Sequence, residues 1–282
     1  MRLLSFKKGN QLGLAVLSNG NWVDVSASGL PADMVQLLQS AHWQAEVQQA
    51  LDRGTPLNLA AVEFLPPFRT PEKILCVGLN YVDHVAESPY KQPNYPTFFA
   101  RFASTLVAHD APIIKPRVSD EFDYEGELVA VIGKAGRHIS VKDALNHVAG
   151  YTIFNEASVR DYQFKAPQWT PGKNFDGTGA CGPWFVTADE LPRGAKGLKL
   201  TTRVNGKVEQ SASTDDMIFD VATQISLASE FATLQPGDLI VTGTPAGVGF
   251  GKKPPIYLKA GDVCEVEIEQ IGVLRNPVAN ER

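Results

Sequence analysis

The chain has 282 residues, of which 44% are hydrophobic and 20% charged, and its formal net charge is −5. This length suits one large domain, alone or with a small appendage. The acidic balance argues against a nucleic-acid-binding protein, which normally carries a basic face. We also expect no membrane association, because no apolar run approaches the ~20 residues that cross a bilayer and the N-terminus lacks the apolar core of a signal peptide.

The N-terminal part predicts a small α+β unit. Short strands are expected over residues 2–6, 11–17 and 21–25, with turn residues between the last two. Two helices are expected near residues 31–40 and 42–53, the second closed by a glycine.

A proline-rich stretch, Phe64–Pro71, is typical of a linker. We place a domain boundary there, with residues 1–68 as the small domain and 69–282 as the larger one. The larger domain is predicted to be rich in strands, at residues 74–78, 127–133, 150–154, 184–187, 198–204 and 238–243. A capping box opens a short helix at residue 140, and apolar spacing predicts an amphipathic helix over 217–233. The fold class is therefore α+β and β-rich.

The three cysteines, Cys76, Cys181 and Cys264, are far apart and form no CxxC pair. This spacing favours reduced thiols over a disulfide framework or a zinc site. Since structural disulfides are rare in the reducing cytoplasm, we expect a cytoplasmic protein.

The stretch Asp123–Gly133, DYEGELVAVIG, joins alternating carboxylates to a run that is apolar on both faces. Side chains two apart on a strand share a face, about 6.6 Å apart. Buried carboxylates such as Glu125 and Glu127 repel each other and lose hydration unless a cation neutralises them. Glu156, which ends another apolar strand, is a candidate third ligand. Oxygen ligands without His or Cys favour Mg²⁺ or Mn²⁺, with Ca²⁺ as a further hard cation.

The alternative is a solvated strand face, and the chain contains an example of one. In the segment 262–270, DVCEVEIEQ, glutamates alternate cleanly with apolar residues. One wet face and one packed face account for that pattern completely. The stretch from Asp123 differs because both faces of its continuation are apolar.

Other residues could support chemistry. His84 and Glu87 are three apart, so on a helix the carboxylate could orient the imidazole as a general base. Arg160 and Gln163 have the same spacing, and Lys173 lies in a turn that could direct its ammonium into a cleft. The alternative for each is a solvated surface side chain.

The glycine-rich stretch 243–253, GTPAGVGFGKK, matches neither a phosphate loop nor a dinucleotide-binding pattern. We interpret it as a tight turn that admits a ligand close to backbone N–H groups. An aromatic pocket wall is a further hypothesis for Tyr90, Tyr95, Phe164 and Trp169, although local packing explains such residues equally well.

Five segments in order resemble the fumarylacetoacetate hydrolase superfamily, over about residues 70 to 279. They are KILCVGLNYVDHVAE, DYEGELVAVIG, GYTIFNEASVRDYQ, GKNFDGTGACGPW and LQPGDLIVTGTPAGVG. The resemblance implies a mixed β-sandwich roll as the core, a small N-terminal domain and a homodimer.

The resemblance also assigns roles to residues. The metal triad would be Glu125, Glu127 and Glu156, and a His–Glu dyad on a lid would be His84 and Glu87. The residues that contact substrate would be Arg160, Gln163, Lys173 and Thr244. One position departs from the family pattern, because the third ligand is commonly aspartate and here it is Glu156.

The activity implied is hydrolysis of an acylpyruvate, a 2,4-dioxo acid, to pyruvate and a carboxylic acid. His84, oriented by Glu87, would take a proton from water, and Lys173 would help to stabilise the oxyanion. The alternatives are decarboxylation of a 2-oxo diacid and isomerisation of a 2-hydroxydienoate in aromatic catabolism. A metal-binding relative without activity is the non-enzymatic alternative.

Overall fold

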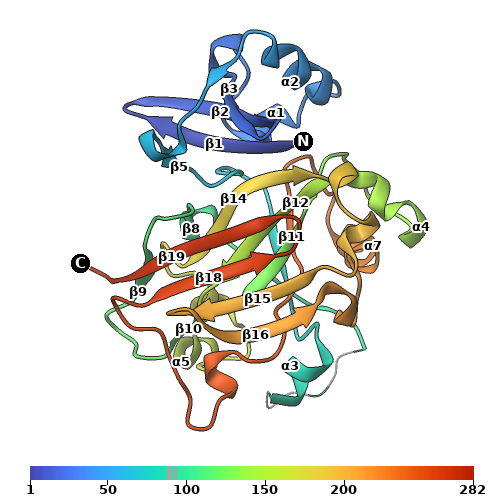
Figure 1. The fold of residues 1–282 in the computed structure, drawn as a ribbon. Coiled ribbons are helices and arrows are strands. Elements are labelled where there is room, and N and C mark those ends of the chain that lie inside the picture. Colours follow the sequence, from blue (N-terminus) through green and yellow to red (C-terminus); the bar gives the residue numbers. More distant parts are fainter. Residues whose placement is uncertain (88–90, 92–93) are drawn as a thin grey trace.

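The computed structural model describes residues 1–87, 91 and 94–282 (Figure 1). The strands are β1 (Arg2–Lys8), β2 (Gln11–Ser18), β3 (Asn21–Asp24), β4 (Thr55–Pro56), β5 (Glu63–Phe64), β6 (Ile74–Gly78), β7 (Thr97–Arg101), β8 (Leu106–Val107), β9 (Ile113–Lys115), β10 (Phe122–Asp123), β11 (Gly126–Ile132), β12 (Val148–Glu156), β13 (Ser158–Val159), β14 (Gly179–Thr187), β15 (Lys199–Val204), β16 (Lys207–Ser213), β17 (Leu239–Val241), β18 (Val263–Ile268) and β19 (Gly272–Asn280). The α-helices are α1 (Met34–Leu37), α2 (Trp43–Leu51), α3 (Val82–Glu87), α4 (Val141–Ala144), α5 (Arg160–Gln163), α6 (Thr170–Lys173) and α7 (Val221–Phe231). The predicted β-rich α+β class is confirmed.

The strands form two main sheets. The larger sheet has 12 strands, with the order β4-β3-β2-β1-β14-β12-β11-β17-β6-β7, while β5 pairs with β1 and β8 with β14. The smaller sheet has five strands, in the order β16-β15-β18-β19-β9. A separate two-stranded sheet pairs β10, which precedes β11 in the chain, with β13, which precedes α5.

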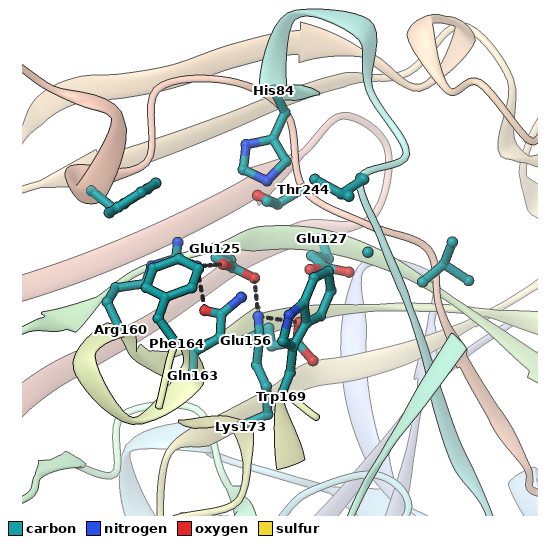
Figure 2. Close-up of a pocket in the computed structure, with 14 residues that line it drawn as sticks. His84, Glu125, Glu127, Glu156, Arg160, Gln163, Phe164, Trp169, Lys173 and Thr244 are labelled. Atoms are coloured by element: carbon teal, nitrogen blue, oxygen red, sulfur yellow. Dashed lines mark hydrogen bonds and ion pairs between the residues drawn. The ribbon is translucent and has the colours of Figure 1, made fainter. Parts of the chain in front are cut away.

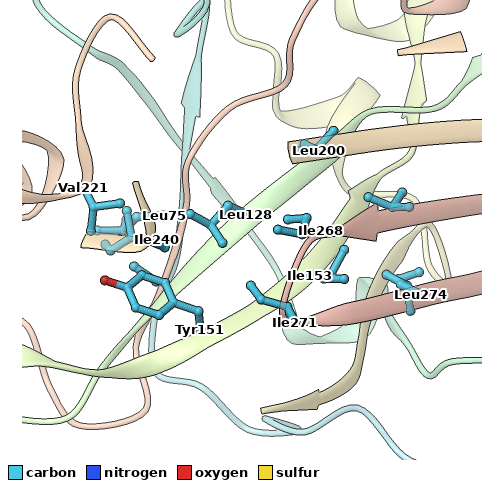
Figure 3. Close-up of a cluster of buried hydrophobic side chains, with 14 of the residues drawn as sticks. Leu75, Leu128, Tyr151, Ile153, Leu200, Val221, Ile240, Ile268, Ile271 and Leu274 are labelled. Carbon is cyan, nitrogen blue, oxygen red and sulfur yellow. The ribbon is translucent and has the colours of Figure 1, made fainter. Parts of the chain in front are cut away.

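Strand β11 is covered on both faces, as its apolar sequence predicts. Leu128 and Ala130 belong to the hydrophobic cluster shown in Figure 3, which also contains Leu200 and Leu274 from the five-stranded sheet. Val129, on the opposite face, belongs to a second cluster that includes residues of the N-terminal segment. Alternate side chains of one strand therefore fill two different cores.

The N-terminal segment joins the larger sheet directly. Strand β1 pairs antiparallel with β14, with Leu3 opposite Phe185, and both residues are buried in one cluster (Figure 1). The domain boundary at residue 68 stays a prediction. Within the described residues, no helix is both long and apolar enough to span a bilayer.

Two predicted helices are shorter than expected. Helix α1 covers only Met34–Leu37, with Asp33 as its N-cap. Helix α7 begins at Val221 rather than near residue 217, because the side chain of Asp220 accepts a hydrogen bond from the amide of Thr223 and caps the helix there. Apolar periodicity continued through residues that the cap excludes from the helix.

Candidate active site

The three predicted glutamates are brought together by strand register. Strands β11 and β12 pair antiparallel with Glu127 opposite Phe154. Glu156 lies two residues beyond Phe154, so its side chain shares a face with that of Glu127. Glu125 lies just before β11, and its carbonyl accepts a hydrogen bond from the amide of Glu156 at 2.8 Å. One carboxylate oxygen from each lies within 4.8 Å of the others, and all three residues are buried.

Asp123, the first carboxylate of the alternating stretch, does not join this cluster. The chain leaves the strand conformation at Tyr124 and Glu125, so Asp123 lies in β10, where it pairs with Ser158 of β13. Strand β11 begins at Gly126, close to the predicted start at residue 127, and the shared face suggested by the alternation does not extend to Asp123. At this break in the strand, the backbone amide of Glu125 donates to a side chain instead, Oδ1 of Asn155, at 3.1 Å.

Two buried cations lie against Glu125. Nη1 of Arg160 is 2.5 Å from its Oε1, and Nζ of Lys173 is 2.7 Å from its Oε2 (Figure 2). Burial by itself raises the pKa of Glu125, but the charges of Arg160 and Lys173 outweigh it and lower that pKa to about 2. Lys173 also contacts Oε2 of Glu156 at 2.9 Å. Burial disfavours its ammonium, yet these two carboxylates raise the pKa of Lys173 and keep it charged.

The negative charge of Glu127 is balanced less well than that of Glu125, which contacts two cations. Its Oε2 accepts a hydrogen bond from the amide of Gly243 at 2.6 Å. Burial, followed by the charges of Glu156 and Glu125, raises the pKa of Glu127 well above its usual value of 4.5. A carboxylate in this environment is stabilised by a nearby cation.

In the metal-free protein, the unfavourable burial of ionised Glu127 should make the free energy of unfolding depend on pH. The pKa of Glu127 is higher in the folded than in the unfolded protein. Its protonated side chain therefore contributes fully to the free energy of unfolding below pH 4.5, and this contribution is lost as the pH rises through the raised pKa. At about pH 8, EDTA-treated Glu127→Gln should therefore exceed EDTA-treated wild type in free energy of unfolding by about 1 kcal/mol or more, with the gap closing near about pH 5. Urea unfolding at both pH values measures this, and a gap that does not change with pH would contradict it.

The residues present fit a divalent ion. Oε1 of Glu156 is buried without a hydrogen-bond partner among the described residues, and Nη1 of Arg101 lies 3.8 Å from it. Four buried carboxylates face three buried cations here: Asp123, Glu125, Glu127 and Glu156 against Arg101, Arg160 and Lys173. The all-oxygen donor set suits Mg²⁺ or Mn²⁺. An added divalent charge would leave the centre positive and suited to an anionic substrate.

The predicted His–Glu pair forms. Nδ1 of His84 lies 2.9 Å from Oε1 of Glu87 on helix α3, and His84 is buried. Because the carboxylate accepts the proton of Nδ1, Nε2 is left as the nitrogen that can exchange a proton. The ring of His84 points toward Glu125 and Thr244 in the pocket (Figure 2).

The glycine-rich turn is built differently from our expectation. Its amides bind protein carboxylates: Gly247 donates to Glu87 at 3.0 Å, and Gly249 and Phe250 donate to Asp123 at 2.8 and 2.9 Å. These three N–H groups are therefore engaged within the protein. The bond from Gly247 connects the turn to helix α3 through Glu87.

Thr244, also in this turn, lines the pocket. Its hydroxyl donates to the carbonyl of Gly126 at 3.0 Å and accepts from Nε2 of Gln210 at 2.8 Å. The hydroxyl thereby secures the turn to β11. Its contact with substrate stays a prediction.

Close packing of α5 against α6 places Gln163 and Lys173 side by side. A Cβ on Gly172 would lie 2.4 Å from the amide nitrogen of Gln163, so only glycine allows this approach. Gln163 in turn accepts a hydrogen bond from Nη1 of Arg160 at 2.9 Å. Lys173 was predicted to lie in a turn, and in the structure it is the last residue of the short helix α6.

Two of the four predicted aromatic residues line the pocket, Phe164 and Trp169. Tyr95 is 49% exposed and does not line it, and Tyr90 lies outside the described residues. Phe250 completes the wall, with its ring centroid 5.1 Å from that of Phe164.

Sequence reasoning missed Phe250, Arg101 and the role of Asp123. Arg101 ends β7, is 3% exposed and lies behind Glu156. Its local sequence contains no pattern that distinguishes it from a surface arginine. Asp123 alternates with Glu125, a pattern that implies a shared strand face, but the strand is interrupted between them.

The chain belongs to the fumarylacetoacetate hydrolase family: the model of the fumarylacetoacetate (FAA) hydrolase C-terminal domain matches residues 73–279. Among curated proteins, oxaloacetate tautomerase FAHD2A, mitochondrial, of Homo sapiens is 41% identical over 99% of this chain and 91% of its own length. Oxaloacetate tautomerase fahd2, mitochondrial, of Xenopus laevis is also 41% identical, over 99% of this chain and 90% of its own length.

Solved structures show the same fold. Fumarylacetoacetate hydrolase from psychrophilic Exiguobacterium antarcticum has a TM-score of 0.87 and 36% identity, with both chains fully covered. Maleylpyruvate hydrolase from Sphingobium sp. SYK-6, in complex with manganese(II) ion and pyruvate, has a TM-score of 0.84 and 30% identity, again over the whole of both chains. The predicted family and its fold are confirmed, and the chain is a member of a family of hydrolases, tautomerases and isomerases.

Proposed function

We propose that this protein is a divalent-metal-dependent tautomerase that interconverts the enol and keto forms of oxaloacetate, a 2-oxo diacid. The proposal depends mainly on one arrangement: three buried glutamates, two buried cations and the His84 ring face a single pocket. The names of the relatives that match nearly the whole chain at 41% identity support oxaloacetate in particular.

Glu125, Glu127 and Glu156 would hold the Mg²⁺ or Mn²⁺. When bound, such an ion acts as a Lewis acid that lowers the energy of negative charge on the substrate. Arg160 and Lys173 supply positive charge that binds and orients an anionic substrate. The reaction transfers one proton to C3 and removes one from the oxygen at C2. We assign the proton at C3 to Nε2 of His84, because Glu87 engages Nδ1.

Acylpyruvate hydrolysis, the activity implied by the sequence resemblance, is the second candidate. The His84–Glu87 pair favours it, since such a pair can activate water. The structural neighbour that binds manganese and pyruvate is a maleylpyruvate hydrolase, which supports the same chemistry. In this reaction Nε2 of His84 would take its proton from water rather than exchange one at C3. The homodimer, the cytoplasmic location and a place in aromatic catabolism stay predictions.

A direct competition of substrates tests the proposal. Protein treated with EDTA and then reloaded with Mn²⁺ or Mg²⁺ is given enol-oxaloacetate or acetylpyruvate, and the decay of enol ultraviolet absorbance is followed with a parallel assay for released pyruvate. We expect metal-dependent enol decay of oxaloacetate without pyruvate, and kcat/KM at least about tenfold lower for acetylpyruvate, a discrimination of about 1.4 kcal/mol. Pyruvate release from acetylpyruvate at the higher kcat/KM would instead establish the hydrolase.

A further inference from the structure

Asp123 is a buried carboxylate whose hydrogen bonds are directed to the wall of the pocket. It is 0% exposed. Its Oδ1 accepts from the amides of Tyr124 and Gly249, each at 2.8 Å, and its Oδ2 accepts from the amide of Phe250 at 2.9 Å and from Nε of Arg160 at 2.8 Å. One side chain thus connects β10, the glycine-rich turn and α5. Such complete satisfaction of a buried charge rigidifies its neighbours.

Arg160 is held by these contacts in one orientation. Its Nε binds Asp123, and its Nη1 contacts Glu125 at 2.5 Å and Gln163 at 2.9 Å. The third nitrogen, Nη2, is buried and has no hydrogen-bond partner in the described part of the chain. Because a guanidinium is planar, fixing Nε and Nη1 also fixes the direction of Nη2. Arg160 lines the pocket, so a buried donor remains available there (Figure 2).

We propose that Asp123 is the positioning residue that directs Nη2 of Arg160 to the second carboxylate of a 2-oxo diacid. This inference rests on the proposed function, since it assigns the recognition of the substrate's far end in the same pocket. Without Asp123, the guanidinium would be free to turn both of its terminal nitrogens toward Glu125, as arginine commonly does with a carboxylate. The donor for the substrate would then be lost.

Asp123 also fixes the aromatic wall beside that donor. The guanidinium carbon of Arg160 lies 5.7 Å from the centroid of the Phe250 ring, and Phe250 contacts Phe164. Because Asp123 accepts from the amide of Phe250, the ring and the guanidinium share one anchor. The aromatic face excludes water and strengthens the ionic contact that Arg160 makes with a carboxylate.

The test is Asp123→Asn in the Mn²⁺-loaded protein. Asparagine keeps the size and one acceptor oxygen, but its amide group would meet the donors of Arg160 and Phe250. Isothermal titration with 2-oxoglutarate as the diacid probe and pyruvate as the monoacid probe measures recognition without turnover. We expect at least about tenfold weaker binding of 2-oxoglutarate, the loss of one charged hydrogen bond, with pyruvate affected less than about threefold. KM for enol-oxaloacetate should rise by a similar factor while kcat changes less.

The matched control is Asp161→Asn. Asp161 follows Arg160 in the sequence, and its Oδ1 accepts a hydrogen bond from the hydroxyl of Ser119 at 2.6 Å. This variant should bind both probes with unchanged affinity. Equal weakening of both probes by Asp123→Asn, or no weakening of either, would overturn the proposal. If Asp123→Asn does not fold, Arg160→Lys provides the test, because lysine lacks the second terminal nitrogen of the guanidinium. Retained preference for 2-oxoglutarate in Arg160→Lys would overturn it equally. Wild-type preference for 2-oxoglutarate without tautomerase activity would support this inference and reject the proposed function.

Discussion

Glu127→Gln is expected to lower kcat/KM for enol-oxaloacetate by about 10³-fold, the loss of about 4 kcal/mol of transition-state stabilisation by a metal ion. Glutamine preserves the shape and one oxygen that can accept from the amide of Gly243. It removes the negative charge that the buried triad needs to hold a divalent cation. Titration of the EDTA-treated variant with Mn²⁺ should show weaker binding alongside the loss of activity.

Glu127 is a better choice for this test than Glu125. Changing Glu125 would also leave Arg160 and Lys173 without a partner, so its effect would mix metal binding with two unpaired cations. Glu267→Gln is the matched control, because this glutamate also lies on a strand, but it pairs with Arg203 at the surface. Full activity of Glu127→Gln with unchanged Mn²⁺ affinity would remove the metal from the proposed reaction.

His84→Asn is expected to lower kcat by about 10²- to 10⁴-fold, the usual range for loss of a general acid–base residue. Asparagine can still contact Glu87 but cannot exchange a proton at neutral pH. Affinity for Mn²⁺ should change less than about threefold, because His84 does not belong to the cluster of carboxylates that would hold the ion. Steady-state kinetics and metal titration on one preparation give both values.

A second histidine provides the control for this experiment. His147 contacts the carbonyl of Lys134 at the surface and does not line the pocket, so His147→Asn should retain full activity. A His84→Asn variant that keeps more than about a tenth of the wild-type kcat would show that another group transfers the proton.

The sequence was sufficient for the fold class, the family and most of the residues that line the pocket. Periodicity alone distinguished two segments of the sequence with alternating glutamates, the one that contains β18 and the one that leads into β11. In β18, apolar residues alternate with half-exposed glutamates, whereas β11 is buried throughout. Five ordered motifs then identified the residues that meet around the pocket. Such inferences succeed because strand periodicity is local, and because each motif carries its own chemistry.

The tertiary structure decided how those residues are connected. The alternation of Asp123 with Glu125 predicted a shared face, but a break in the strand turned Asp123 toward Arg160 instead. The glycine-rich turn was expected to offer its amides to a ligand, and carboxylates of the protein accept four of them. No sequence pattern placed Arg101 behind Glu156.

The physical reason is the same in each case. Residue type and spacing determine what a side chain can do and which face of its own element it occupies. Its partners, its burial and therefore the direction of its pKa shift depend on elements far away in the chain. Glu125 and Glu127 are two residues apart, yet the pKa of Glu125 is lowered to about 2 and that of Glu127 is raised. The tertiary structure separates them, because it brings Arg160 of α5 and Lys173 of α6 to Glu125.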